Sequence, residues 1–118
     1  MIVDLTQVKA YLRVDSMDED ELITALLTTA QKVVSDVARL SEEDMNTLMT
    51  MSFDDTSITV SIRGETLNFS QALAWNKLLN TAVLYTVGYL YENREQADHH
   101  DMMLTLRCLL GSIREVIV

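Results

Sequence analysis

Two clusters of side chains have residue types that can bind a metal ion. His99, His100 and Asp101 are consecutive, but successive residues of a helix point about 100° apart, whereas a helical histidine pair that binds one ion is spaced i, i+4. The acidic run at residues 18–21 lacks the alternating oxygen ligands and the central glycine of a calcium-binding loop. We therefore expect no metal and no other cofactor, and we interpret the clusters as a polar connection and a helix start.

The chain carries no recognisable catalytic motif. It contains neither the glycine-rich loop that binds phosphate nor the G-x-S-x-G turn of hydrolases. Its one cysteine, Cys108, is surrounded in sequence by Leu106, Leu109 and Leu110, which predicts a small core residue rather than a nucleophile. A single cysteine also excludes an intramolecular disulfide. These observations point to no candidate catalytic residue.

Composition and charge narrow the class of protein further. The chain has 118 residues, of which 48% are hydrophobic and 23% charged, with no proline and three glycines; this favours one helical domain, residues 1–118, over a many-turned β-sandwich. The net charge of −9 argues against a free-standing nucleic-acid-binding protein. Residues 1–60 carry 12 acidic and four basic side chains. No apolar run reaches the roughly 18 residues of a membrane span, and no signal-peptide pattern is present, so we expect a protein made in a reducing cytoplasm.

Hydrophobic periodicity predicts a mainly α fold, a small bundle of about four to five helices. Apolar side chains recur at helical spacing in four segments, with a weaker signal in a fifth. These segments are residues 5–14, 22–39, 71–96 and 101–118, and the weaker one is residues 45–49. Residues 97–101 are the expected polar connection before the last helix.

Capping residues and polar faces support these helices. We expect Asp4 with Gln7 and Ser41 with Asp44 to form capping boxes, and Ser70 to cap the long helix. The side of the second helix opposite its apolar stripe is polar. It carries Thr24, Thr28, Gln31, Lys32, Ser35 and Asp36.

The period of the hydrophobic pattern changes to two after residue 52. Ile58, Val60 and Ile62 alternate with polar residues, Gly64 follows, and residues 66–69 can return as a second strand. This pattern predicts a β-hairpin insertion over residues 57–69, between the second long helix and the third. Because an isolated hairpin is marginally stable in water, it must pack on helices or on another subunit.

The second half of the long helix contains two unusual features. Gly88 interrupts a good helix at a cost of about 1 kcal/mol relative to Ala, which predicts that another backbone or a bulky aromatic ring approaches there. Tyr91, Glu92, Asn93 and Arg94 then place aromatic and ionic groups together. Two hypotheses remain open: the charges are solvated, or they form a fixed polar network in which Arg94 binds carboxylates or helix-terminal carbonyls.

Several short segments resemble, in their order and spacing, one family of phage proteins. The resemblance is to the head–tail connector, or adaptor, proteins of long-tailed bacteriophages, and it covers roughly residues 4–40 and 71–114. The segments that carry it are LTQVKAYLRV at residues 5–14, the acidic turn ending in Asp20 and Glu21, AVLY at residues 82–85, YENRE at residues 91–95 and LRCLL at residues 106–110. Residues 41–69 depart from the family's pattern.

The resemblance implies a structural virion protein of the head–tail interface, which is not an enzyme and is made in the cytoplasm of the bacterial host. Such proteins form a homo-oligomeric ring, dodecameric in the virion, beneath the portal protein; the ring extends the DNA channel and carries the tail or stopper protein. Double-stranded DNA passes through without sequence-specific binding, and no membrane is involved. The negative charge fits such a channel, because carboxylates repel phosphates.

The resemblance also directs attention to candidate structural and interface residues. These candidates are Gly88, Tyr91, Glu92, Asn93, Arg94, Val116, Ile117 and Val118. Burying each of the last three would contribute about 1.5–3 kcal/mol. They either pack back onto the neighbours of the last helix or dock onto the portal or an adjacent subunit.

Two other classes of function fit the composition. An acidic regulatory binding module, such as a DNA mimic or an inhibitor of a host enzyme, would act as a monomer or dimer, so its oligomeric state distinguishes it from a connector. A small helical enzyme would need Glu92, Arg94 and Arg107 to converge on one pocket, and the periodicity does not require this.

Overall fold

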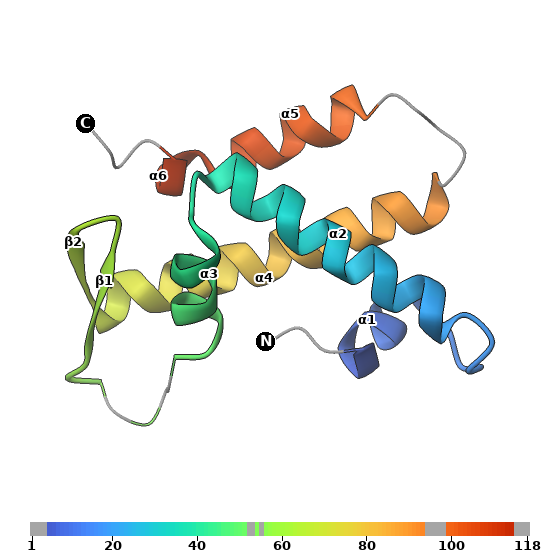
Figure 1. Ribbon diagram of the computed structural model, residues 1–118, viewed down its shortest axis with the longest axis horizontal. Helices are drawn as coiled ribbons and strands as arrows, with labels where there is room; N and C mark the ends of the chain where they lie inside the picture. The colour runs from blue at the N-terminus through green and yellow to red at the C-terminus, as the bar shows by residue number, and fades with distance from the viewer. Residues whose placement is uncertain (1–4, 52–53, 55, 94–98, 115–118) are drawn as a thin grey trace.

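Two long helices cross at the centre of the molecule and run in opposite directions (Figure 1). The computed structural model describes residues 5–51, 54, 56–93 and 99–114. Helices and one hairpin are the regular elements of these residues, which confirms the predicted fold class. The elements are α1 (Leu5–Leu12), α2 (Asp20–Ala38), α3 (Glu42–Met49), β1 (Thr59–Ile62), β2 (Glu65–Asn68), α4 (Phe69–Glu92), α5 (His100–Leu109) and α6 (Gly111–Arg114).

The core lies where α2 packs on α4. Ile23 and Val34 of α2 and Leu79 and Val83 of α4 are completely buried, as the predicted apolar stripe of α2 requires. The remaining face of α2 is not uniformly exposed, however, because Ser35 is buried. Its hydroxyl donates to the Lys32 carbonyl at 2.9 Å, and this hydrogen bond makes burial of the polar group tolerable.

Capping side chains fix where α3 and α4 begin. Ser41 and Asp44 form the expected capping box of α3, with the Asp44 amide 3.1 Å from Ser41 Oγ. The cap of α4 is Asn68 rather than the predicted Ser70. Asn68 ends β2 in an extended conformation, and its side chain accepts from the Gln71 amide at 2.9 Å while the Gln71 side chain accepts from the Asn68 amide. Asp4 lies outside the described residues.

The helices α1, α4 and α5 end earlier than the periodicity predicts. Arg13 adopts a left-handed conformation, so α1 ends at Leu12 rather than at residue 14. The helix α4 ends at Glu92, capped by Asn93, rather than at residue 96; residues 94–98 lie outside the description.

The prediction of one continuous helix over residues 101–118 is also wrong. It breaks at Leu110 into α5 and the short α6. Gly111, a poor helix former, follows the break, and α6 then brings the Ile113 carbonyl within hydrogen-bond distance of Arg63. Residues 115–118 lie outside the described residues.

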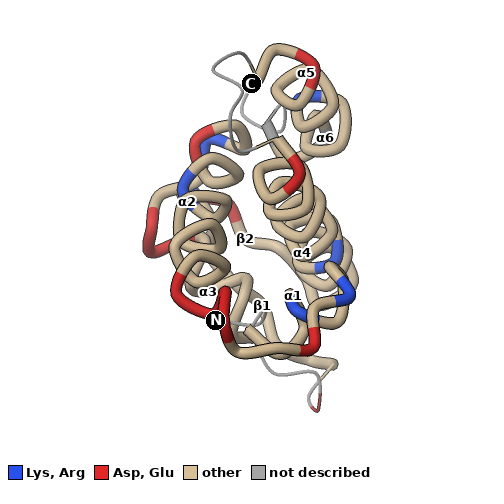
Figure 2. Tube along the Cα trace, turned by 90° about the vertical axis from the view of Figure 1, so that its right-hand side faces the viewer, with Lys and Arg blue, Asp and Glu red and all other residues tan. Residues whose placement is uncertain are grey.

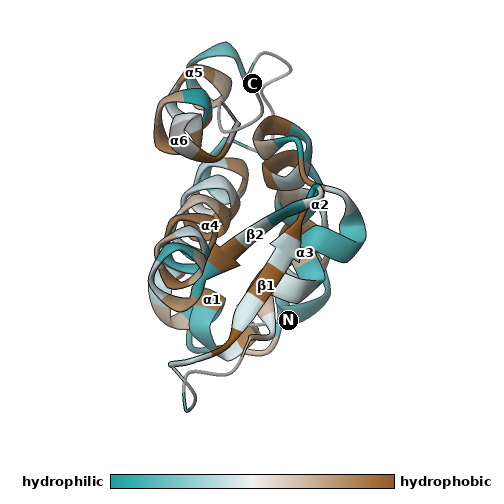
Figure 3. Cartoon of the chain, turned by 90° about the vertical axis from the view of Figure 1, so that its left-hand side faces the viewer, coloured by the Kyte–Doolittle hydropathy of each residue, from teal (hydrophilic) through white to brown (hydrophobic). Residues whose placement is uncertain are grey.

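The hairpin is present where the alternating pattern predicts it, between α3 and α4. Strands β1 and β2 are antiparallel, with Val60 opposite Leu67, and hydrophobic and hydrophilic residues alternate along them (Figure 3). The turn residues Arg63 and Gly64 both have positive φ, 53° and 82°, as a two-residue hairpin turn of type I′ requires. Ile62 and Leu67 are buried, so the hairpin is stabilised by packing on α3 and α4.

Within the described residues, no helix is both long and apolar enough to cross a membrane.

Candidate interaction surfaces

The candidate chemical groups do not gather into a metal or catalytic site in the part of the chain that the structure describes. No three His, Cys, Asp or Glu side chains there are placed to hold a metal ion. Cys108 is exposed, which corrects the prediction of a core residue: α5 turns Met102 and Leu106 inward and leaves Cys108 on its outer side. Glu92 on α4 and Arg107 on α5 are also exposed.

The side chain that approaches Gly88 is Tyr11 of α1. A Cβ atom added at Gly88 would lie 2.9 Å from Tyr11 Cε2, closer than two carbon atoms pack. The predicted close approach of an aromatic ring is therefore confirmed. Tyr11 remains 51% exposed, so its ring covers Gly88 on one side and faces solvent on the other. A role for Gly88 in contacts between subunits stays a prediction.

A hydrogen bond joins the end of α4 to the start of α2. The Tyr91 hydroxyl donates to the carboxylate of Glu19, the residue before α2, through a short hydrogen bond. Beside it, Lys9 of α1 forms an ion pair with Asp20 at 2.8 Å. Both pairs are partly shielded from solvent, so they contribute more than fully exposed pairs. They hold α1, α2 and α4 together at one end of the molecule.

The neighbours of Tyr91 act locally or are not described. Glu92 is exposed, and Asn93 donates from Nδ2 to the Tyr89 carbonyl of its own helix at 2.9 Å. Arg94 and the three apolar candidates Val116, Ile117 and Val118 lie outside the described residues. The structure thus brings Tyr91 to Glu19, and it leaves the hypothesis for Arg94 a prediction.

Arg63 is a structural residue that the sequence pattern did not indicate. From the hairpin turn, its Nη1 donates to the carbonyls of Ala38 and Arg39 at 3.2 and 3.4 Å, and its Nη2 donates to the Ile113 carbonyl at 2.6 Å. The guanidinium also lies 5.5 Å from the ring centre of Trp75. Because carbonyls at a helix C-terminus carry partial negative charge, they are good partners for a cation. These partners are 12 to 50 positions away in sequence, and no local motif marks them.

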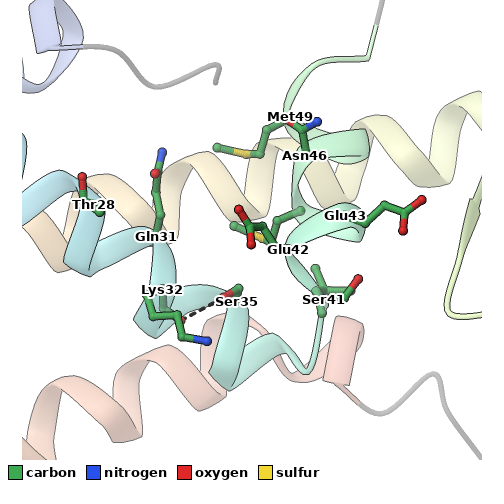
Figure 4. Close-up of a pocket in the computed structure, with 11 residues that line it drawn as sticks. Thr28, Gln31, Lys32, Ser35, Ser41, Glu42, Glu43, Asn46 and Met49 are labelled. Carbon is green, nitrogen blue, oxygen red and sulfur yellow. Dashed lines mark hydrogen bonds between the residues drawn. The ribbon is translucent and has the colours of Figure 1, made fainter.

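A groove separates α2 from α3 (Figure 4) and has a volume of about 1070 Å³. Within it, the Glu42 carboxylate points into the space between Gln31 and Met49, whereas Glu43 points away (Figure 4). The groove is lined by Thr28, Gln31, Lys32, Ser35, Leu40, Ser41, Glu42, Glu43, Met45, Asn46 and Met49. Met45 and Met49 are almost fully buried, so the surface that the groove presents is mainly polar and acidic and suits a partner that carries a positive charge.

Charge is distributed unevenly between the two long helices. Acidic positions follow the loop before α2, α2 itself and α3 (Figure 2). The helix α4, in contrast, contains only two charged residues, Lys77 and Glu92. Acidic charge is therefore concentrated on α2, α3 and the loop before α2, whereas α4 itself is poor in charge.

A comparison with family models identifies one match. The model for "Phage gp6-like head-tail connector protein" matches residues 2–106, a range that includes residues 41–69, where the resemblance seen in the sequence was lost. No curated protein and no solved structure matches the chain.

Proposed function

The chain belongs to the phage gp6-like head-tail connector family, and from this premise we propose that it forms a closed ring of identical subunits beneath the portal. The ring extends the DNA channel and joins the head to the tail or stopper protein. The observation that carries this proposal is the family match, which spans residues 2–106. The family is one of structural connectors rather than enzymes.

The shape and charge of the subunit support a ring. A ring is built from heterologous contacts, in which two different surfaces of each subunit meet. The acidic side at α2 and α3 and the charge-poor side of α4 are two such unlike surfaces. The net charge of −9 also supports a channel in which DNA does not stick, because the protein lacks the clustered cations that bind phosphates.

The oligomeric state in solution tests this proposal. We expect light scattering and native mass spectrometry, repeated over a range of protein concentrations, to show one closed oligomer whose mass stops increasing above a threshold concentration. Electron micrographs of that species should show rings, and the rings should co-sediment with the portal protein of the same phage. A stable monomer or dimer that binds a cationic host protein would instead favour an acidic regulatory module.

A further inference from the structure

We propose that neighbouring subunits meet through one face of α4 on one copy and the groove between α2 and α3 on the next copy, with Lys77 paired to Glu42. This assignment rests on the proposed ring and adds to it the two surfaces that touch. The occupant of the groove is thus a second copy of this chain.

The first surface is a stripe along α4, formed by Ala74, Lys77, Thr81 and Leu84. These residues are spaced by three, four and three positions and therefore share one face of the helix. Ala74, Lys77 and Thr81 are exposed and Leu84 is half-buried. Four residues after Leu84, the same face of the helix contains Gly88, which the half-exposed ring of Tyr11 covers.

Between Ala74 and Leu84, the α4 stripe faces away from α2 and α3. At about 100° per residue, the fully buried Leu79 lies on the opposite side of the helix from the middle of the stripe. The helices α2 and α3 pack on that buried side, so the groove between them cannot contact the stripe of its own chain. Two surfaces on opposite sides of one subunit are the arrangement that head-to-tail assembly requires.

The chemistry of the two surfaces is complementary. The α4 stripe has small and apolar side chains around one cation, and helices that present such a face without covering it are typical of interfaces. The groove has one inward-pointing carboxylate, Glu42, beside Met49 and the polar side chain of Gln31 (Figure 4). Within the described residues neither Lys77 nor Glu42 has an ion-pair or hydrogen-bond partner. Each charged side chain is therefore unpaired within the described part of its own subunit, and the other surface offers a side chain of opposite charge.

Reciprocal charge reversal tests the pairing. We expect Lys77→Glu and Glu42→Lys each to weaken assembly by about tenfold or more, as reversal of one member of a close interfacial charge pair does. The double variant Lys77→Glu with Glu42→Lys should recover most of the loss. The matched controls are Glu43→Lys, which changes the same charge in the same helical turn at a side chain that points away from the groove space (Figure 4), and Arg107→Glu on α5; both should assemble nearly as the natural protein does. Thermal unfolding of each variant shows that the subunit is folded.

Site-specific cross-linking gives an independent measurement. In a Cys108→Ser background, which removes the exposed thiol, Lys77→Cys and Glu42→Cys are combined and treated with a short bismaleimide. Because the two thiols lie on opposite sides of one subunit, the cross-links must join different copies, and we expect a ladder of covalent oligomers. Either cysteine alone should give almost no product.

The outcomes separate this assignment from the ring itself. Rings that tolerate Lys77→Glu and give no ladder would overturn the assignment and leave the ring proposal intact. Loss of assembly in Glu42→Lys alone, without effect of Lys77→Glu or rescue in the double variant, would mean that the groove binds a different segment. A natural protein that stays monomeric at every concentration would overturn both proposals.

Discussion

At the scale of single residues, three arginines share an uncommon backbone conformation. Arg13, Arg39 and Arg63 have φ values of 60°, 59° and 53°, a left-handed region that costs a residue with a side chain about 1–2 kcal/mol. Arg13 and Arg39 follow α1 and α2, where glycine is the usual residue. Arg63 differs from the other two because its guanidinium binds three carbonyl groups and faces Trp75. Among the described residues, side-chain hydrogen bonds offset this backbone cost at Arg63 and not at the other two arginines.

Substitution by glycine should distinguish the energetic cost of the backbone conformation from the contribution of the side-chain contacts at these positions. We expect Arg39→Gly to raise the free energy of unfolding by about 0.5–1 kcal/mol, because glycine adopts the left-handed conformation without strain. Arg63→Gly should lower it by about 1–3 kcal/mol, since the loss of charge-assisted hydrogen bonds outweighs the same backbone gain. Urea denaturation of the two variants measures both values. Equal shifts of the same sign would show that the Arg63 contacts contribute nothing.

The hydrogen bond between Tyr91 and Glu19 can be tested in the same way. Tyr91→Phe should lower the free energy of unfolding by about 1–2 kcal/mol, because the partly buried carboxylate of Glu19 loses a donor. The matched control is Tyr85→Phe, which removes a hydroxyl from the same helix at another half-buried position. If both variants unfold at the same urea concentration, the Tyr91 hydroxyl does not hold α4 to α2.

At the scale of elements, local patterns predicted most of the fold, and long-range contacts account for the errors. The stripe of α2, the capping box at Ser41 and the hairpin are encoded within a few residues, so periodicity and turn chemistry reveal them. The break at Leu110 is different, because α6 is held by a hydrogen bond from Arg63, 50 positions earlier. Likewise, the sequence indicated that a backbone or an aromatic ring approaches Gly88, but not that the group is the ring of Tyr11.

The packing of α1 on α4 depends on the missing side chain of Gly88. Leucine at this position gains about 1 kcal/mol or less in helix propensity, but it collides with the Tyr11 ring, and overpacking costs about 1–3 kcal/mol. We expect Gly88→Leu to lower the unfolding temperature, whereas the control Ala25→Leu, at an exposed position of α2, should have little effect.

If the Tyr11 ring causes the loss of stability in Gly88→Leu, removal of the ring should reverse the sign of the change in the free energy of unfolding. In a Tyr11→Ala background, we expect Gly88→Leu to be neutral or stabilising by a few tenths of a kcal/mol, up to about 1 kcal/mol. Thermal melts of the four proteins form a double-mutant cycle. A Gly88→Leu penalty that is unchanged without Tyr11 would place the collision elsewhere.

At the scale of the whole molecule, the acidic surface and the charge-poor surface lie on different sides of the fold and come from different parts of the sequence. Most acidic residues precede residue 60, and six of them lie on α2 and α3 (Figure 2). The charge-poor α4 is packed behind them (Figure 1). Two unlike sides are what the proposed head-to-tail association of copies requires, and the excess negative charge disfavours nucleic acid as a tight partner.

The relation to DNA gives the last prediction. Non-specific duplex binding needs Lys and Arg side chains that neutralise several phosphates together, and it then reaches dissociation constants of about 10⁻⁴–10⁻⁶ M at physiological salt. This chain has nine Lys and Arg among 18 acidic residues, and α4 contributes one cation, Lys77.

We therefore expect no binding of a duplex to the subunit or to its oligomer at protein concentrations of about 10 µM, in fluorescence anisotropy at physiological salt. A basic protein binds more tightly as salt is removed, whereas this protein should not, because weaker screening strengthens the repulsion between its carboxylates and the phosphates. The control is a basic protein of similar size with the same duplex. Sub-micromolar binding that weakens steeply with added salt would contradict this prediction, and it would also remove the electrostatic argument that DNA slides through the ring without being held.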